Sequence, residues 1–235
     1  MNLTIDIGNT HTKMALFDGD KIIGCWKDSW DKEHYAAQVE QVAVCATGKM
    51  PPLSDLIPKG VAVCQVSSSI NLPITLDYDT PETLGADRIA AAAAAAGLFR
   101  GHGCVIIDVG TCVTVDFLDS HSVYHGGAII PGVAMQLEAL HTFTEKLPLI
   151  NLSSYSRATS VCGQSTRESI LAGVMDGIIF SLQGFVSHYF ERGLADCVVC
   201  TGGGAHYLSL PESWKNEPDL VMIGMNEILN KVNKS

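Results

Sequence analysis

Two short stretches of the sequence share one pattern, LTIDIGNTHTK at residues 3–13 and VIIDVGTCVTV at residues 105–115. Each is an apolar strand that ends in an Asp, continues through an apolar residue and a Gly, and then turns through polar residues. The two aspartates, Asp6 and Asp108, lie 102 residues apart. A repeat of this size indicates an internal duplication, whereas a solenoid would repeat over a much shorter period. We therefore predict an α/β protein of two similar lobes, residues 1–101 and 102–235.

The remaining chain alternates between strand and helix patterns. The strands that we expect from alternating or short apolar runs lie at residues 3–7, 13–17, 21–26, 42–47, 61–66, 104–107, 113–118, 123–130, 198–201 and 221–224. The helices that we expect lie at residues 31–41, 53–57, 85–96, 132–141, 165–192 and after 224. Seven consecutive alanines at 90–96 favour a helix and permit close approach by a neighbouring element.

Composition excludes several classes of protein. The formal net charge of −10 disfavours a nucleic-acid binder, which needs a basic surface to replace counterions on phosphates. The start of the chain, MNLTIDIGN, has no basic region before an apolar core, so we expect no secretory signal. The longest apolar run, residues 89–99, is too short to cross a bilayer. These features predict a cytoplasmic protein with no nucleic-acid or membrane partner.

The eight cysteines lie mostly within apolar stretches, which predicts buried, reduced thiols. Cys197 and Cys200 have the spacing of a redox or zinc motif. A zinc site would need a second matching pair, which the sequence lacks, so we interpret this pair as structural.

The first repeat suits phosphate binding. Gly8 lets backbone amides approach a phosphate closely, and Lys13 offsets phosphate charge. Asp6, at the end of its strand, is placed to hold hydrated Mg²⁺, which prefers one or two carboxylates plus substrate phosphates. An ordinary hairpin would explain one such pattern equally well. Because Asp108 and Gly110 repeat it, two opposed hairpins that grip a polyphosphate become the better interpretation.

Three further patterns are less specific. Residues 201–205, TGGGA, form a glycine turn that suits either a nucleotide or tight packing. Asp87 and Arg88, in LGADRIA, stand at a helix start, where an Asp is either a helix-stabilising charge or a general base. His121 and His125 have metal-like spacing, but no carboxylate partner is evident and we do not expect a zinc site. No P-loop or dinucleotide-binding signature occurs.

The ordered set of motifs resembles the type III pantothenate kinases, also called the Bvg accessory factor-like family, over nearly the whole chain. The matching motifs are DIGNT at 6–10, GADR at 85–88, IDVGT at 107–111, GGAIIPG at 126–132, KLP at 146–148, GQST at 163–166 and TGGGA at 201–205. The resemblance implies two ribonuclease-H-like lobes around a nucleotide cleft, as in actin, Hsp70 and sugar kinases. It also implies phosphorylation of the 4′-hydroxyl of pantothenate by ATP, the first step towards coenzyme A.

The resemblance assigns roles to individual residues. Asp87 would be the proton acceptor and Asp108 would hold a monovalent cation, K⁺ or NH₄⁺. Mg²⁺ would accompany the nucleotide at Asp6, and the enzyme would be a homodimer. The residues expected to bind ATP are Asp6, Ile7, Gly8, Asn9, Thr10, His11, Thr12, Lys13 and Thr111. Those expected to bind pantothenate are Tyr78, Gly85, Ala86, Asp87, Arg88 and Thr166.

Two alternatives remain open at this point. The chain could be another small-molecule kinase or phosphatase of the same superfamily, although such an enzyme would not be expected to share GADR with Tyr78 and Thr166. It could instead be a catalytically silent nucleotide-binding regulator, which would be expected to lack Asp87 or Asp108.

Overall fold

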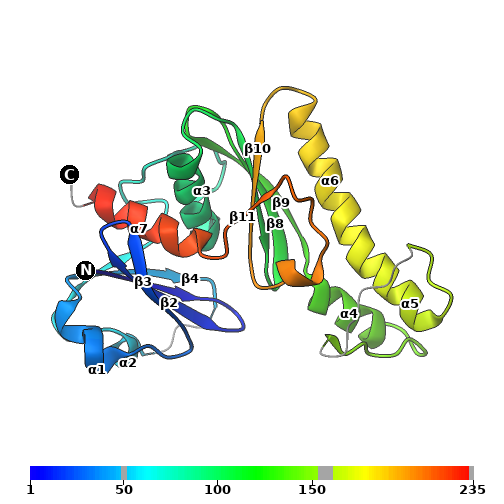
Figure 1. Cartoon of the computed structure of the whole chain (residues 1–235), viewed down its shortest axis with the longest axis horizontal. Coiled ribbons are helices and arrows are strands. Elements are labelled where there is room, and N and C mark those ends of the chain that lie inside the picture. Colours follow the sequence, from blue (N-terminus) through cyan, green and yellow to red (C-terminus); the bar gives the residue numbers. More distant parts are fainter. Residues whose placement is uncertain (49–51, 153–160, 233–235) are drawn as a thin grey trace. The chain divides into compact units, whose positions relative to one another are not determined.

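A computed structural model describes residues 1–48, 52–152 and 161–232 of the chain (Figure 1). The contacts divide it into two compact units. Unit 1 holds residues 1–102, residues 118–126 and the C-terminal segment from Asp219, and unit 2 holds residues 103–117 and 127–218. These units are defined by contacts and not by the sequence repeat, so the lobes 1–101 and 102–235 remain a prediction.

Unit 1 contains a five-stranded sheet in the order β3-β2-β1-β4-β5. The central strand β1 is antiparallel to β2 and parallel to β4, and β5 extends the parallel side. The strands are β1 (Asn2–Ile7), β2 (Thr12–Asp18), β3 (Lys21–Lys27), β4 (Gln41–Ala46) and β5 (Ala62–Gln65). The strand and hairpin pattern predicted for the first repeat is therefore confirmed.

Side-chain alternation gives this sheet two buried faces. One face packs Leu3, Ile5 and Ile7 with Trp30 and with apolar residues of three short helices. Those helices are α1 (Lys32–Tyr35), η1 (Ala36–Gln38) and α2 (Leu53–Leu56). The helix predicted for residues 31–41 is thus shorter and divided, because β4 already begins at Gln41 and takes that backbone into the sheet.

The other face of the sheet is covered by α3 (Ala86–Leu98) and α7 (Leu220–Val232), which pack on each other (Figure 1). Residues 90–95 are all buried, and the backbone of Ala90 lies against Gly224 so closely that a Cβ on Gly224 would overlap it. The strand predicted at residues 221–224 is therefore wrong. That short apolar run belongs to α7, and its packing on the alanines of α3 decides in favour of a helix.

Unit 2 repeats the arrangement. Five strands of the six-stranded second sheet run in the order β11-β10-β7-β8-β9, so β7 takes the place that β1 has in unit 1, with a parallel neighbour, β10, on one side. The strands are β7 (Cys104–Val109), β8 (Cys112–Leu118), β9 (Val123–Pro131), β10 (Cys197–Thr201) and β11 (Lys215–Asn216). The same order of strands around both aspartates supports the duplication read from the sequence.

Helices complete the core of unit 2. They are α4 (Val133–Thr142), α5 (Thr166–Leu171) and α6 (Gly177–Phe190), with a π-helical turn η4 (Ala172–Asp176) between the last two. The prediction of one long or two consecutive helices over residues 165–192 is confirmed. The stretch Thr166–Phe190 is long and apolar enough to cross a membrane, but half of its most apolar window is buried in the protein, as in a core helix.

The tip of the β8–β9 hairpin belongs to unit 1. There a two-residue strand, β6 (Thr75–Leu76), pairs in parallel with the start of β9, placing Thr75 opposite Val123 and Leu76 opposite Tyr124. We predicted no strand here, because residues 67–80 are mainly polar and contain Pro73. This pairing brings residues 77–78 beside the start of β9.

Candidate active site

Asp6 ends the central strand of unit 1, opposite Lys13 on β2 and Cys45 on β4. Its Oδ1 atom is buried and has no hydrogen-bond partner. Burial and the charge of Asp87 raise the pKa of Asp6 to about 6, although Lys13 acts in the opposite direction. A buried carboxylate oxygen without a partner is costly, so this position is suited to a cation that arrives with a ligand.

Asp87 lies in the first turn of α3, where Gly85 is the N-cap residue. Its Oδ1 accepts a hydrogen bond of 2.8 Å from the backbone N–H of Arg88. This is the position that a helix-stabilising charge would take. However, the effect of Asp87 on the pKa of Asp6 places the two carboxylates within electrostatic range in one unit. The role of Asp87 as the proton acceptor stays a prediction.

The hairpin between β1 and β2 is held by a residue that sequence reasoning missed. The backbone N–H of Thr12 donates to Asp28 Oδ1 at 3.0 Å, and His11 Nδ1 lies 3.0 Å from Asp28 Oδ2. The Asp28 N–H in turn donates to the Thr12 carbonyl at 2.7 Å. Asp28 adopts φ +63°, a strained conformation for a residue other than Gly. It thus fixes the end of the hairpin predicted to bind ATP.

Within that hairpin the tip is open. Gly8 donates its N–H to the His11 carbonyl at 3.1 Å, while Asn9 and Thr10 are exposed between them. A Cβ on Gly48 would overlap the carbonyl of Gly8, so the segment after β4 lies directly against the hairpin. The structure therefore brings the predicted ATP-binding residues 6–13 together on one edge of the first sheet.

The predicted pantothenate residues of unit 1 meet around a buried tyrosine that the sequence analysis did not select. Arg88 is buried and lies over the ring of Tyr124, 5.9 Å from its centroid, in a cation–π contact. Tyr78 packs on the same ring with centroids 6.1 Å apart. Gly126 has φ +83°, and a Cβ there would lie 3.1 Å from the Tyr78 ring. Tyr124 is the centre of this cluster.

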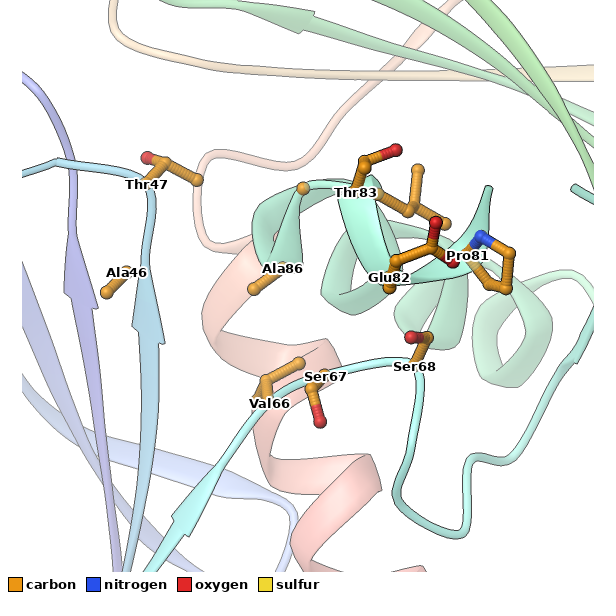
Figure 2. Close-up of a pocket in the computed structure, with 11 residues that line it drawn as sticks. Ala46, Thr47, Val66, Ser67, Ser68, Pro81, Glu82, Thr83 and Ala86 are labelled. Atoms are coloured by element: carbon orange, nitrogen blue, oxygen red, sulfur yellow. The ribbon is translucent and has the colours of Figure 1, made fainter. Parts of the chain in front are cut away.

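A pocket of about 410 Å³ opens beside the start of α3 (Figure 2). Its walls come from the carboxyl ends of β4 and β5, from η2 (Pro81–Thr83) and from the first residues of α3. Ligands of α/β proteins commonly bind at the carboxyl ends of strands. The lining residues are Ala46, Thr47, Val66, Ser67, Ser68, Pro81, Glu82, Thr83, Leu84, Gly85 and Ala86. The pocket therefore includes Gly85 and Ala86, two residues expected to contact pantothenate.

The predicted residues of the second repeat lie in unit 2. Asp108 ends β7, as Asp6 ends β1. Gly202, at φ +92°, approaches it so closely that a Cβ would overlap Asp108 Oδ1 and the backbone of Val109. The Thr111 carbonyl accepts the N–H of Gly132 at 3.0 Å. The glycine turn of residues 202–204 thus serves close packing around Asp108, and the role of Asp108 as a ligand of a monovalent cation stays a prediction.

Thr166 is exposed at the first turn of α5. Ser165 caps this helix by accepting the N–H of Glu168 at 3.2 Å, and Glu168 accepts the N–H of Gln164 at 2.8 Å. Thr166 belongs to unit 2, whereas Tyr78, Arg88 and Asp87 belong to unit 1. Its expected contact with pantothenate stays a prediction.

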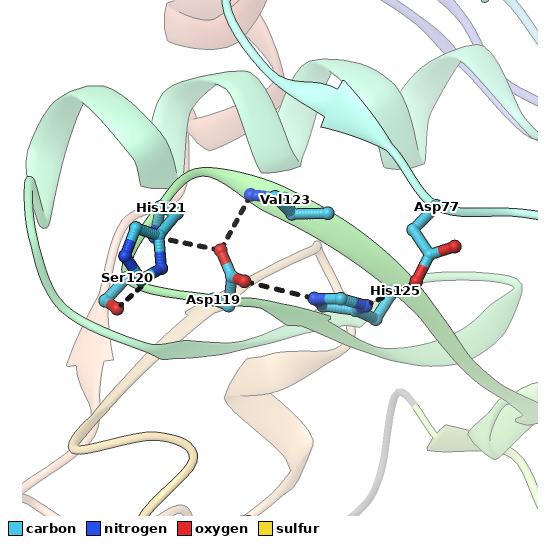
Figure 3. Close-up of polar contacts among 6 residues, drawn as sticks. All are labelled: Asp77, Asp119, Ser120, His121, Val123 and His125. Carbon is cyan, nitrogen blue, oxygen red and sulfur yellow. Dashed lines mark hydrogen bonds and ion pairs between the residues drawn. The ribbon is translucent and has the colours of Figure 1, made fainter.

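His125 has carboxylate partners, contrary to our expectation from the sequence. Its ring lies between Asp77, 2.9 Å from Nδ1, and Asp119, 3.2 Å from Nε2 (Figure 3). Asp77 is 48 positions away, and only the pairing of β6 with β9 brings it to His125. His121 contacts Ser120 through its ring, not His125.

All eight cysteines are free thiols. Cys197 is the strand partner of Cys104 and its thiol donates to the Gly103 carbonyl at 3.3 Å. Three positions along the strand, Cys200 points to the opposite face, where burial raises its pKa to about 12. The two residues of the CVVC motif therefore face different sides of the sheet, as expected of structural thiols.

No group of three or more His, Cys, Asp and Glu side chains arranged to hold a metal occurs in residues 1–48, 52–152 and 161–232. A divalent ion at Asp6 would thus need other ligands, such as nucleotide phosphates and water. The unpartnered Asp6 oxygen fits that arrangement, in which Mg²⁺ takes one or two protein carboxylates.

Comparison with solved structures defines the fold. The chain matches a Campylobacter jejuni protein, described as a transcriptional activator of the Baf family, with TM-score 0.61 and 20% identity, covering 99% of this chain and 100% of the other. It matches an archaeal actin homolog with TM-score 0.52 and 12% identity, covering 97% and 99%. The fold is that of the actin, sugar-kinase and Hsp70-like ATPases.

Sequence comparisons define the family. The sequence model of the family described as type III pantothenate kinase matches residues 2–71 and 53–188. A type III pantothenate kinase from Cytophaga hutchinsonii is 39% identical over 244 aligned positions, covering 98% of this chain and 99% of the relative. The chain belongs to the type III pantothenate kinase family.

Proposed function

We propose that this kinase transfers the γ-phosphoryl group of ATP to the 4′-hydroxyl of pantothenate, the first step of coenzyme A biosynthesis. The observation that carries the proposal is the pair of carboxylates in unit 1. Asp6 has a buried oxygen without a partner and a raised pKa, which suits a nucleotide-bound cation. Asp87, near enough to raise that pKa, is available as a base for the acceptor hydroxyl.

The reaction needs few groups from the protein. The pantothenate oxygen forms a bond to the γ-phosphorus, the bond from that phosphorus to the β–γ bridging oxygen breaks, and ADP leaves. Asp87 accepts the proton of the attacking hydroxyl. The backbone of the hairpin at Gly8 and the Lys13 ammonium are proposed to bind the phosphates, and Thr111 is proposed as a further ATP contact. Because such transfer depends mainly on positioning and charge, these contacts account for most of the catalysis.

The acceptor side is built around α3. Gly85 and Ala86 line the pocket of about 410 Å³, whose size is within the range of small-molecule sites. Arg88 and Tyr78, packed on Tyr124, supply a cation for the pantothenate carboxylate and an apolar wall. Thr166 is proposed to complete the site.

Two cations complete the proposal. Mg²⁺ bound with ATP, held at Asp6, would neutralise phosphate charge. Asp108 would hold K⁺ or NH₄⁺ in the cradle that Gly202 leaves free of a Cβ.

The proposed enzyme is a cytoplasmic homodimer. Unit 2 has large apolar side chains exposed on its surface. They are Ile129 on β9, Met135 on α4, Phe143 directly after α4 and Phe180 on α6. Beside Phe180, Gly177 and Gly184 have open space where a Cβ would stand. Because these three residues share one face of α6, a second copy could approach closely there.

A coupled assay of ADP release tests the function. With purified protein, Mg²⁺ and ATP, we expect release that depends on pantothenate and increases when Na⁺ is replaced by K⁺ or NH₄⁺. ADP release that does not depend on pantothenate would favour another small-molecule kinase of the same superfamily. ATP binding without turnover at any pantothenate concentration would favour the nucleotide-binding regulator.

A further inference from the structure

His125 joins three segments of unit 1. It is the third residue of β9, and its ring bridges the carboxylates of Asp77 and Asp119 (Figure 3). The Asp119 carboxylate is itself fixed, because its Oδ1 accepts the N–H groups of His121 and Val123 at 2.9 and 2.8 Å. One end of the bridge is thus anchored in the β8–β9 turn.

The other end of the bridge holds the strand that leads to Tyr78. Asp77 donates its N–H to the Tyr124 carbonyl at 2.9 Å, and its carboxylate meets His125 Nδ1 at 2.9 Å. The next residue, Tyr78, packs against Tyr124 and Gly126. These are the two neighbours of His125 along β9, so the ring of His125 and the Tyr78 cluster are set by one short piece of backbone.

The chemistry of the bridge requires a charged ring. A neutral imidazole has one N–H and could donate to only one of the two carboxylates, leaving its other nitrogen lone pair against the second. The imidazolium donates from both nitrogens and pairs with both charges. The charged groups that face the ring are Asp77, from the segment after β6, and Asp119, from the turn before β9.

We propose that His125, as an imidazolium, is a positioning residue for the acceptor site, holding the segment of Asp77 and Tyr78 against Tyr124 and thereby beside Arg88. This inference rests on the proposed function of that cluster in binding pantothenate. It adds a residue that touches neither substrate and acts through Tyr78.

A pH dependence follows. Burial lowers the pKa of His125, but the hydrogen bonds and charges of Asp119 and Asp77 outweigh burial and raise it above its ordinary value of 6.5. The bridge is therefore complete below pH 6.5 and is lost as the pH rises through the raised value. We expect the KM for pantothenate to rise over that interval, while the KM for ATP does not follow it.

Three variants test the bridge. His125→Gln cannot carry charge and should raise the KM for pantothenate about 3- to 10-fold at pH 6.5, with a flat pH profile, as expected for losing a charge-assisted hydrogen bond. His125→Arg stays charged at every pH and should keep a low, pH-independent KM. His121→Gln, at the same turn but with its ring on Ser120, is the matched control and should keep the wild-type profile.

A measurement without turnover accompanies these assays. In an NMR titration, the His125 pKa of wild type should exceed 6.5 and should fall in Asp77→Asn. Three results would each overturn the proposal. In His125→Gln, the KM for ATP could rise as much as the KM for pantothenate, or the pH dependence of the KM for pantothenate could stay as in wild type. In Asp77→Asn, the pKa of His125 could stay unchanged. If wild type shows no pantothenate-dependent turnover, the proposed function fails instead, and the titration still tests the bridge.

Discussion

The carboxylate of Asp87 raises the pKa of Asp6, adding to the effect of burial, although the two residues lie 81 positions apart. Two carboxylates held close together repel each other, and one of them takes up a proton more readily. Lys13 offsets only part of this effect. A ligand that brings a further cation would relieve the remaining repulsion.

This arrangement makes stability depend on pH. In the unfolded chain Asp6 ionises near 3.8, whereas in the folded protein it stays protonated until about pH 6. The folded state binds more protons between these values, so the free energy of unfolding falls as the pH rises from about 4 to about 6. Above pH 6 the penalty is complete and amounts to about 2 to 3 kcal/mol.

Asp6→Asn should remove that penalty. We expect the melting temperature of the variant to exceed that of wild type clearly at pH 8 and only slightly at pH 4. Asp18→Asn, which changes an exposed carboxylate at the end of β2, is the control for the loss of one acidic side chain and should change the melting temperature only slightly. A difference for Asp6→Asn that is the same at pH 4 and pH 8 would contradict the raised pKa.

Asp87→Asn should separate catalysis from binding. The amide oxygen can still accept the Arg88 N–H, so the start of α3 should be preserved. Loss of a general base typically lowers kcat by about 10² to 10⁴-fold. We expect this loss with an ATP dissociation constant near that of wild type, measured by calorimetry. A kcat within twofold of wild type would exclude Asp87 as the base, and Asp79→Asn provides an exposed carboxylate control.

Much of the fold could be predicted from sequence because its signals are local. Alternating apolar residues before Asp6 and Asp108 define a strand, and the glycines that follow define a turn. The strand predicted at residues 221–224 was wrong because a run of four apolar or small residues is compatible with strand and helix alike. The helix is favoured there by close packing of Gly224 on Ala90, some 130 positions away, and no local sequence pattern contains that contact.

The candidate site was less accessible for the same reason. The motifs indicated Asp6, Asp87 and Arg88 as site residues. They did not indicate that Arg88 and Tyr78 would both pack against the ring of Tyr124. Nor could spacing reveal that His125 meets Asp77, since the two-residue strand β6 has no recognisable sequence signal. Contacts between residues of distant segments can be predicted only when the pairing of the strands is already known.

Asp28→Gly should weaken ATP binding. Glycine keeps the φ of +63° without strain but removes the carboxylate that holds Thr12 and His11. The hairpin should become less ordered, and we expect the KM for ATP to rise about 3- to 10-fold, by the typical value of one such hydrogen bond. The KM for pantothenate is the internal control. An equal rise in both constants would indicate general disorder and not loss of hairpin positioning.

Gly184→Arg should dissociate the proposed dimer. An added Cβ at this exposed position meets no neighbouring atom within 4 Å, and replacing Gly in a helix favours the helix by up to about 1 kcal/mol. The monomer should therefore stay folded while a second copy is kept away from α6. Light scattering after gel filtration should give half the mass of wild type. Gln38→Arg, an equal charge change on η1, should leave the mass unchanged, and a wild-type mass for Gly184→Arg would place the interface elsewhere.

Gly202→Ala and Gly203→Ala form a matched pair beside Asp108. At Gly202 the φ of +92° disfavours any Cβ, and the added atom would overlap the Asp108 carboxylate and the Val109 backbone. At Gly203 an added Cβ meets nothing. We expect Gly202→Ala to lower the free energy of unfolding by about 2 to 4 kcal/mol, from backbone strain and overpacking together. Gly203→Ala should change it by less than about 1 kcal/mol. Because the overlap falls on the Asp108 carboxylate itself, Gly202→Ala should also need more K⁺ for half-maximal activity. The free energies of unfolding are measured by denaturant titration. Equal values for the two variants would show that the glycine turn does not shape the surroundings of Asp108.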